Sequence, residues 1–291
     1  MFEGTHTALV TPFRDDRIDT EAFRALIDFQ IAEGVAGIVP VGTTGESPTL
    51  THEEHNEVIR LAVEAAAGRC KVIAGTGSNS TAEAIALTVE AEKMGADAAL
   101  LVAPYYNKPS AEGLYLHYRA IAEAVKIPII LYSIPGRCGI EIGIDTVVRL
   151  AADCPNIVSI KEAGGNVERV SQLRAALPAE FEILSGDDSL TLPFMSVGAV
   201  GVISVASNII PREVVHLVGA WLAGKPEAAA KLHRKWYPFF KALFVESNPV
   251  PIKTALSFQG KMTADVRLPL APLSEANTAG LRAVLREYGL L

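Results

Sequence analysis

The sequence predicts an α/β fold, a (β/α)8 TIM barrel that is followed by a C-terminal helical extension. Short β-branched apolar runs recur about every 20 to 34 residues, the length of one strand plus one crossover helix. Several runs are apolar at every position, as in strands that helices cover on both faces of a parallel sheet. Hydrophobic residues make up 49% of the chain, which is enough for a large core.

Eight such runs are present, and eight strand–helix units fit a closed barrel better than an open doubly wound sheet. The run Gly75–Ser80 also lacks the third glycine of a dinucleotide-binding fingerprint. The predicted strands are Thr7–Val10, Gly37–Val41, Lys71–Gly75, Ala98–Ala103, Pro128–Tyr132, Ile157–Lys161, Phe181–Ser185 and Gly201–Val205.

The stretches between these strands have the start and stop signals of helices. Apolar residues recur three and four apart from residue 20 until Gly34. Thr51 with Glu54, and Ser80 with Glu83, fit capping boxes at the start of the next two helices.

Two segments bear on the domain organisation. Residues 189–211 carry no charge, but their prolines and glycines predict a helix and a strand and not a membrane span. More chain follows the eighth strand than one closing helix needs. We therefore expect a catalytic barrel over residues 1–224 and a helical extension over residues 225–291.

Composition excludes several classes of function. A net charge of −7 and a pI near 5.5 argue against nucleic acid or an anionic membrane as the main partner. The N-terminus has no signal-peptide pattern. Three scattered cysteines (Cys70, Cys138 and Cys154) indicate a reduced, cytoplasmic protein. A mean hydropathy of +0.27 suggests buried contacts between subunits.

The active site of a barrel of this kind forms at the carboxyl ends of its strands. Polar or small residues follow or close five of the predicted strands, so we expect them to converge there. They are Thr43 and Thr44, Tyr105 and Tyr106, Tyr132, Lys161, and Gly186.

Lys161 ends the sixth predicted strand and is the candidate covalent catalyst. A lysine has a pKa of about 10.4 in water, and lowering it by about 3 units costs roughly 4 kcal/mol, which a dry barrel mouth can impose. The neutral amine can attack a ketone, and the resulting iminium acts as an electron sink. The alternative is a structural ion pair with Glu162 or another carboxylate.

Three neighbouring features fit such a site. The Tyr132 phenol could shuttle protons opposite the lysine, although a strand-end tyrosine is often a core aromatic. The turn Gly42–Ser47 could hold a small carboxylate on its N–H groups and hydroxyls, or could be only a tight turn. Arg137 could grip a carboxylate through two hydrogen bonds, or lie in solvent on its loop.

The run His52–His55 contains two histidines but does not predict a metal centre. Its histidines are three residues apart, not the four of the zinc-protease motif, and a capped first helical turn explains the charges. We expect neither a metal nor a cofactor.

Five ordered motifs carry a resemblance over essentially the whole chain. The sequence resembles the dihydrodipicolinate synthase / N-acetylneuraminate lyase family of class I aldolases. The matching motifs are Gly42–Ser47, Pro104–Pro109, Tyr132–Arg137, Ile160–Ala163 and Ser185–Asp188.

The resemblance implies a role for each candidate residue. Lys161 would form an imine with pyruvate, and Tyr132, Thr43 and Tyr106 would relay protons, with Tyr106 reaching a neighbouring subunit. Thr44 would hold the pyruvate carboxylate. The remaining implied pocket residues are Gly186 and Ile203, which would line it through backbone groups, and Arg137.

Arg137 indicates the branch of the family. An arginine here is similar to the synthase branch, where it receives the carboxylate of aspartate semialdehyde in lysine biosynthesis. The resemblance also implies a homo-oligomer, a dimer of dimers, with an inhibitory L-lysine site at a dimer interface. The matching lysine-site positions are Ser47, Pro48, His52, His55, Asn79, Glu83 and Tyr105.

The sequence departs from the family pattern in three places. Ser133 stands where asparagine is usual, Cys138 where a small hydroxyl residue is common, and Ser247 interrupts a usual Glu-Pro-Asn-Pro run. None is an assigned catalytic group, although Cys138 beside Arg137 predicts sensitivity to thiol reagents.

Two other functions are compatible with parts of the pattern. One is a lyase or dehydratase of the same chemistry that acts on a 2-keto-3-deoxy sugar acid or N-acetylneuraminate, which Arg137 disfavours. The other is a non-catalytic barrel that senses small acids or lysine, which the set Lys161, Tyr132, Thr43 and Tyr106 disfavours.

Overall fold

Eight parallel strands close into a barrel, as the sequence predicts. The computed structural model describes residues 1–291, and its strands hydrogen-bond in the order β1-β10-β9-β8-β7-β6-β5-β4, with β4 returning to β1. The barrel strands are β1 (Gly4–Ala8), β4 (Gly37–Val39), β5 (Lys71–Gly75), β6 (Ala98–Val102), β7 (Ile129–Ser133), β8 (Ile157–Glu162), β9 (Glu182–Ser185) and β10 (Gly201–Ser204).

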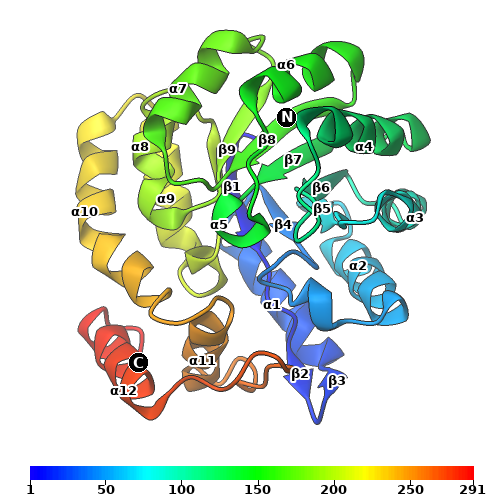
Figure 1. Ribbon diagram of the computed structural model, residues 1–291. Helices are drawn as coiled ribbons and strands as arrows, with labels where there is room; N and C mark the ends of the chain where they lie inside the picture. The colour runs from blue at the N-terminus through cyan, green and yellow to red at the C-terminus, as the bar shows by residue number, and fades with distance from the viewer.

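A helix follows each of these strands, and together the helices form the outer ring of the molecule (Figure 1). Every barrel strand is buried along most of its length, which explains the continuously apolar runs. The helices of the ring are α1 (Thr20–Ala32), α2 (His52–Ala66), α3 (Thr81–Lys93), α4 (Ala111–Ala124), α6 (Ile144–Asp153), α7 (Val167–Ala176), α8 (Thr191–Met195) and α9 (Pro211–Leu222).

The helix starts show how local sequence sets these boundaries. Thr51 caps α2 in a complete capping box, in which Thr51 and Glu54 each bind the other's backbone N–H. The second predicted box is only half formed. Ser80 accepts from the backbone of Glu83, but the Glu83 carboxylate turns to Ser78 and His52 instead.

A short hairpin was not predicted. Its strands β2 (Phe13–Arg14) and β3 (Arg17–Ile18) pair antiparallel at the lower edge of the molecule (Figure 1). Asp15 and Asp16, at the turn, have φ values of 51° and 60°, a left-handed conformation that aspartate tolerates better than most residues. Two-residue strands with charged ends carry no apolar alternation, so the pattern that reveals the barrel strands is missing here.

The uncharged stretch 189–211 divides into helices and a strand, as expected. The 3-10 turn η2 (Asp188–Leu190) leads into α8, and β10 is followed by η3 (Ala206–Asn208). No helix in the chain combines the length and the apolar character needed to cross a membrane.

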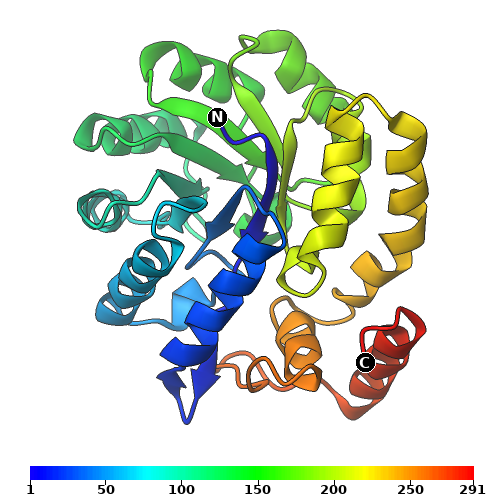
Figure 2. The same ribbon diagram turned by 180° about the vertical axis from the view of Figure 1, so that it is seen from behind.

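Three further helices follow the ring. These are α10 (Pro226–Ala242), α11 (Val250–Phe258) and α12 (Glu275–Glu287), which lie along one side and the lower edge of the barrel (Figure 2). Their apolar residues belong to the same contiguous core as those of the barrel, among them Phe239, Ile252 and Leu281. The extension thus shares one hydrophobic core with the barrel, and the predicted boundary between the two at residue 224 stays a proposal.

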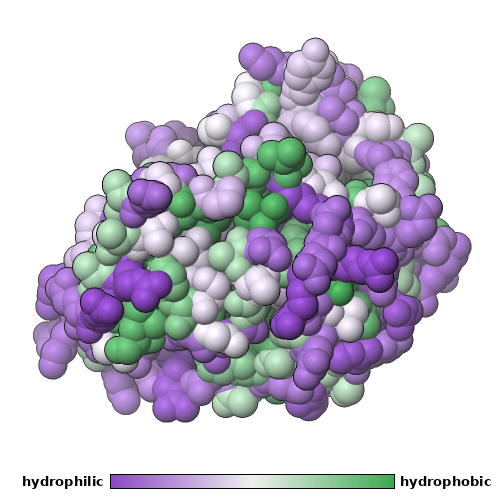
Figure 3. Space-filling model, turned by 90° about the horizontal axis from the view of Figure 1, so that it is seen from below, coloured by the Kyte–Doolittle hydropathy of each residue, from purple (hydrophilic) through white to green (hydrophobic).

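The face near α11, α12 and the hairpin is chemically mixed. Seen from below, apolar patches lie among polar and charged side chains (Figure 3). The extension leaves several large apolar side chains exposed, of which Leu268 is the most open at 84%.

Candidate active site

Lys161 lies at the end of β8 with its side chain inside the barrel mouth. It is 6% exposed and forms no ion pair. Burial lowers its pKa to about 7, an effect that Arg137 reinforces and Asp188 partly opposes. About half of the amines are therefore neutral at pH 7.

The alternative role for Lys161, an ion pair with Glu162, is not what the structure shows. Successive residues of a strand point to opposite faces, and the Glu162 carboxylate binds Arg169 at 2.8 Å. It also accepts the backbone N–H of Gly164 at 2.7 Å. The carboxylate next in sequence is thus fully engaged elsewhere, and the amine is left to face the barrel mouth.

Tyr132 lies beside Lys161 on the neighbouring strand β7. The two residues are register partners, and the Lys161 Nζ atom is 4.2 Å from the centroid of the Tyr132 ring. Burial raises the pKa of Tyr132 to about 12, although the Arg137 charge and hydrogen bonding with the Thr43 side chain lower it. The phenol therefore keeps its proton at neutral pH and can donate it.

Gly186 lies directly against the Lys161 side chain, which leaves no room for a Cβ atom at this position. A Cβ atom at this position would lie 2.7 Å from the Cβ of Ala163 and 3.0 Å from the Cε of Lys161. The glycine is thus required by a close approach, as its place after the seventh strand suggested. Ile203, on β10, is buried at the same end of the barrel.

Asp188 is a buried carboxylate that the sequence analysis left without a role. One oxygen accepts from the Ser204 hydroxyl, and the other accepts the backbone N–H groups of Val205 and Ala206 at 3.0 and 2.9 Å. Burial raises its pKa to about 6. The sequence signal for this buried carboxylate is the pair Asp187 and Asp188 shortly after an apolar strand, because one of two consecutive residues there has to face the interior.

The turn after β4 holds Thr43 and Thr44. Thr44 is buried, and its Oγ1 accepts the side-chain amide of Asn248 at 2.9 Å. Glu46, in the same turn, is also buried and adopts a left-handed conformation with φ of 55°. This turn is therefore held from the C-terminal extension and not only by the barrel.

Arg137 and Cys138 lie on α5 (Pro135–Cys138), a single turn that follows β7 and lies over the middle of the ring in Figure 1. The Arg137 guanidinium donates to the backbone carbonyl of Asn248 at 3.3 Å and is otherwise open to solvent. Cys138 is 3% exposed, and burial raises the pKa of its thiol to about 11. Ser133, beneath this loop, accepts the backbone N–H of Ile142 at 3.4 Å.

A cavity of about 430 Å³ connects two groups of predicted site residues. Its wall includes Thr43 and Tyr132 from the predicted catalytic residues, and Arg137 from the predicted substrate-binding residues. The same wall includes Ser47, Pro48, His52, His55, Glu83 and Tyr105 from the predicted lysine site. Lys161 lies outside this lining, beyond the Tyr132 ring.

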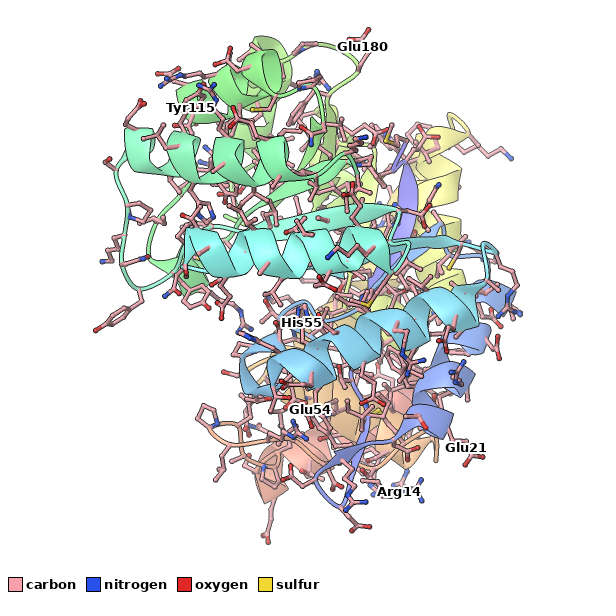
Figure 4. The ribbon with its side chains drawn as sticks, turned by 90° about the vertical axis from the view of Figure 1, so that its right-hand side faces the viewer. Arg14, Glu21, Glu54, His55, Tyr115 and Glu180 are labelled. Atoms are coloured by element: carbon pink, nitrogen blue, oxygen red, sulfur yellow. The ribbon has the colours of Figure 1, made fainter.

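The predicted lysine-site residues form a polar cluster between α2 and α3. The His52 ring contacts the Glu83 carboxylate at 2.8 Å, while the buried His55 contacts the carbonyl of Gly75 at 2.9 Å. In Figure 4, His55 is on the side of α2 that faces α3. Asn79 donates to the backbone of Tyr105 at 3.2 Å. Hydrogen bonds from Ser78 and His52 lower the pKa of Glu83, so it offers a negative charge.

Glu54 lies on the opposite side of α2 and has a different partner. Both of its carboxylate oxygens accept from Arg267 at 2.7 Å, which ties α2 to the C-terminal extension. Figure 4 shows Glu54 directed toward that segment. The four residues of the run His52–His55 thus do not converge on one point.

Tyr106 is the one predicted catalytic residue that the chain does not bring to its own site. Its side chain is 90% exposed, and its backbone has the left-handed φ of 71°. A bulky aromatic residue in this conformation is uncommon and needs support from its surroundings. Tyr105, next to it, is exposed by 38%.

The family of the chain follows from a comparison with known proteins. The model of the dihydrodipicolinate synthetase family matches residues 1–288. The chain belongs to this family. Among its relatives, the 4-hydroxy-tetrahydrodipicolinate synthase of Geotalea uraniireducens is 53% identical over 291 residues, the whole of both chains.

Solved structures of the dihydrodipicolinate synthetase family share the same fold. The dihydrodipicolinate synthase (DHDPS) of Cyanidioschyzon merolae, solved with lysine bound, is 44% identical with a TM-score of 0.97 over 100% of this chain and 99% of its own. The chloride-inhibited synthase of Acinetobacter baumannii, solved with pyruvate, is 46% identical with a TM-score of 0.97 over the whole of both chains. The predicted closed barrel is therefore confirmed by its relatives as well as by its own topology.

Proposed function

We propose that the protein is a 4-hydroxy-tetrahydrodipicolinate synthase, which condenses pyruvate with aspartate semialdehyde through a Schiff base on Lys161. The observation that carries this proposal is a buried lysine with a pKa near 7 and no ion-pair partner, beside a protonated tyrosine. The names of full-length relatives and the pyruvate complex of the Acinetobacter baumannii enzyme support it.

The chemistry follows from these groups. The neutral amine of Lys161 attacks the keto carbon of pyruvate, and the carbinolamine loses water to give an iminium. Loss of a methyl proton then gives an enamine, whose carbon attacks the aldehyde carbon of aspartate semialdehyde. Each of these steps moves a proton, and the Tyr132 phenol with Thr43 is positioned to carry it.

We assign the carboxylates of the two substrates to two groups. Thr44, in the turn after β4, would hold the pyruvate carboxylate through its hydroxyl and the surrounding N–H groups. Arg137, at the open side of the cavity, would receive the carboxylate of the aldehyde. Gly186 and Ile203 would line the pocket through their backbone.

The test of the covalent step is intact mass after pyruvate and borohydride. Wild-type protein should gain the mass of one pyruvate less one water plus two hydrogens, and Lys161→Ala should gain nothing. Absence of the adduct in folded wild-type protein would refute the enzymatic proposal and favour a sensor. A second assay separates the synthase from a lyase of the same chemistry. The synthase should turn over pyruvate with aspartate semialdehyde and should not turn over a 2-keto-3-deoxy sugar acid or N-acetylneuraminate.

We further propose a homo-oligomer, a dimer of dimers, in which Tyr106 completes the proton relay of a neighbouring subunit. The side chain of Tyr106 is almost fully exposed in one chain, so it is free to enter another. Tyr106→Phe should slow turnover, and a mixture with Lys161→Ala subunits should regain activity if the two sites share residues.

The three free thiols support a reducing, cytoplasmic location.

We also propose that L-lysine inhibits the enzyme at the cluster around Glu83. The lysine-bound Cyanidioschyzon merolae structure supports this, as do the charged Glu83 and its neighbours His52, His55 and Asn79. Ser47, Pro48 and Tyr105 complete the proposed site. Glu83→Gln should weaken lysine inhibition about tenfold or more, because it removes the charge that pairs with the ammonium. An equal response of both proteins to millimolar lysine would contradict this.

A further inference from the structure

The C-terminal extension contacts both groups that the proposed function assigns to substrate carboxylates. Asn248, just before α11, is 5% exposed. Its side-chain amide donates to the Thr44 hydroxyl at 2.9 Å, and its backbone carbonyl accepts from Arg137 at 3.3 Å. One residue of the extension therefore joins the two groups, although they come from loops after different strands.

A buried ion pair also ties the extension to the turn that Asn248 contacts. Lys253, on α11, contacts the Glu46 carboxylate at 2.5 Å, and neither side chain has any solvent exposure. The second oxygen of Glu46 accepts the backbone N–H of Arg267 at 3.0 Å. Glu46 lies two residues after Thr44, so α11 is tied to the same turn that Asn248 contacts.

The hydrogen bond between Asn248 and Thr44 has a directional consequence. A hydroxyl has one hydrogen to donate and two lone pairs that accept. The amide N–H of Asn248 occupies a lone pair of the Thr44 oxygen, which leaves the hydroxyl hydrogen free for another partner. An anion is such a partner, because it can only accept.

We propose that Asn248 is a positioning residue that presents the Thr44 hydroxyl as a donor to the carboxylate of the keto acid. Through its backbone it also sets the distance between Thr44 and Arg137. This inference rests on the proposed function, since it concerns the binding of that substrate. The role of the extension is then to organise substrate binding from outside the barrel.

The test is the pyruvate dependence of borohydride trapping. Asn248→Ala removes the amide donor and should raise the pyruvate concentration for half-maximal trapping about fivefold, the effect of one lost hydrogen bond. Asn248→Asp has nearly the same shape but can only accept, so it should take the Thr44 hydrogen and repel the anion. Its half-maximal concentration should exceed that of Asn248→Ala. Trapping at saturating pyruvate should stay within about twofold of wild type.

Two comparisons distinguish positioning from a general structural role. Ser247→Ala, at the exposed neighbour, should leave the pyruvate dependence unchanged. Thr44→Val should make a second change at Asn248 nearly silent, because the hydroxyl that Asn248 orients is gone. Asn248→Asp is close enough in shape to fold if Asn248→Ala does not, which thermal unfolding will show.

The outcomes separate this inference from the proposed function. If wild-type protein forms no adduct, the Schiff-base function itself is wrong. If wild-type protein forms the adduct and both Asn248 variants half-saturate at the wild-type pyruvate concentration, only the positioning role is wrong. Additive effects of Thr44→Val and Asn248→Ala would also overturn it.

Discussion

The Nζ atom of Lys161 lies 4.2 Å from the centroid of the Tyr132 ring, and no carboxylate forms an ion pair with that amine. The two residues are neighbours across β7 and β8, so the barrel itself sets their separation. Burial acts on both in opposite directions. It lowers the pKa of the amine to about 7 and raises that of the phenol to about 12, so one group is ready to attack and the other to donate.

The first prediction concerns Asp188 and the pH dependence of imine formation. Only the neutral amine attacks, so trapping at low pyruvate should rise from pH 6 to pH 8 with an inflection near 7. The Asp188 carboxylate raises the pKa of Lys161, so Asp188→Asn should move the inflection to lower pH. Trapping rates across this range measure the shift.

The control for this prediction is Asp145→Asn, which removes an exposed carboxylate on α6. It changes the net charge by the same amount and should leave the inflection in place. An inflection that stays fixed in Asp188→Asn, or moves to higher pH, would mean that this carboxylate does not act on the amine.

The second prediction concerns Gly186. Gly186→Ala would place a Cβ atom 3.0 Å from the Cε of Lys161, so the lysine has to move. A displacement of about 1 Å can slow a reaction about 100-fold, and we expect trapping to slow at least tenfold. Borohydride trapping and urea unfolding should be measured on the same protein.

A glycine-to-alanine change without such a contact is the matched control. Gly219, on α9, has open space where its Cβ would lie, so Gly219→Ala should stabilise the helix by about 0.5–1 kcal/mol and leave trapping unchanged. If Gly186→Ala traps pyruvate at the wild-type rate, the close approach of the Lys161 side chain to residue 186 does not matter for imine formation.

The sequence predicts the barrel well because its strands are buried on both faces. Each of the eight predicted runs overlaps one strand of the barrel, and the bounds differ by at most three residues at the start and two at the end. The largest difference is at β1, predicted at Thr7–Val10 and observed at Gly4–Ala8. Leu9 and Val10 are fully buried, so their apolar character does not tell a strand from the loop that follows it.

The candidate site could be predicted only where it follows the strands. Lys161, Tyr132 and Thr44 are found by asking which polar residues end apolar runs. Asn248 and Lys253 could not be found in this way, because Asn248 lies 204 residues from Thr44 and no pattern links them. A contact between a helical extension and a barrel loop depends on tertiary packing, which local periodicity does not encode.

The third prediction revises the expected reactivity of Cys138. The thiolate is the reactive form, and burial raises the pKa of this thiol to about 11, so about one in ten thousand is ionised at pH 7. Iodoacetamide should therefore inactivate the enzyme slowly at pH 7 and faster at higher pH. Whatever inactivation occurs at this site should disappear in Cys138→Ser. Rapid inactivation at pH 7 that Cys138→Ser abolishes would show that the thiol is more accessible than its burial indicates.

The last prediction concerns acid stability. Burial lowers the pKa of His6 and of His117 to about 4, against 6.5 for an exposed histidine. A group with a lowered folded-state pKa binds its proton more readily when unfolded. Its stabilising effect is complete above pH 6.5 and is lost as the pH falls toward 4. Each histidine should therefore lower the free energy of unfolding at pH 5 by roughly 2 kcal/mol relative to pH 7.

Asp188 acts in the opposite sense, because its raised pKa of about 6 makes the folded state gain a proton as the pH falls. Asp188 is present in both wild type and His117→Gln, so a comparison of their free energies of unfolding reports the contribution of His117 alone. The free energy of unfolding in urea should fall less between pH 7 and pH 5 in His117→Gln than in wild type. His216→Gln is the exposed control on α9 and should follow wild type. If His117→Gln shows the wild-type difference between the two pH values, His117 is not held neutral by burial.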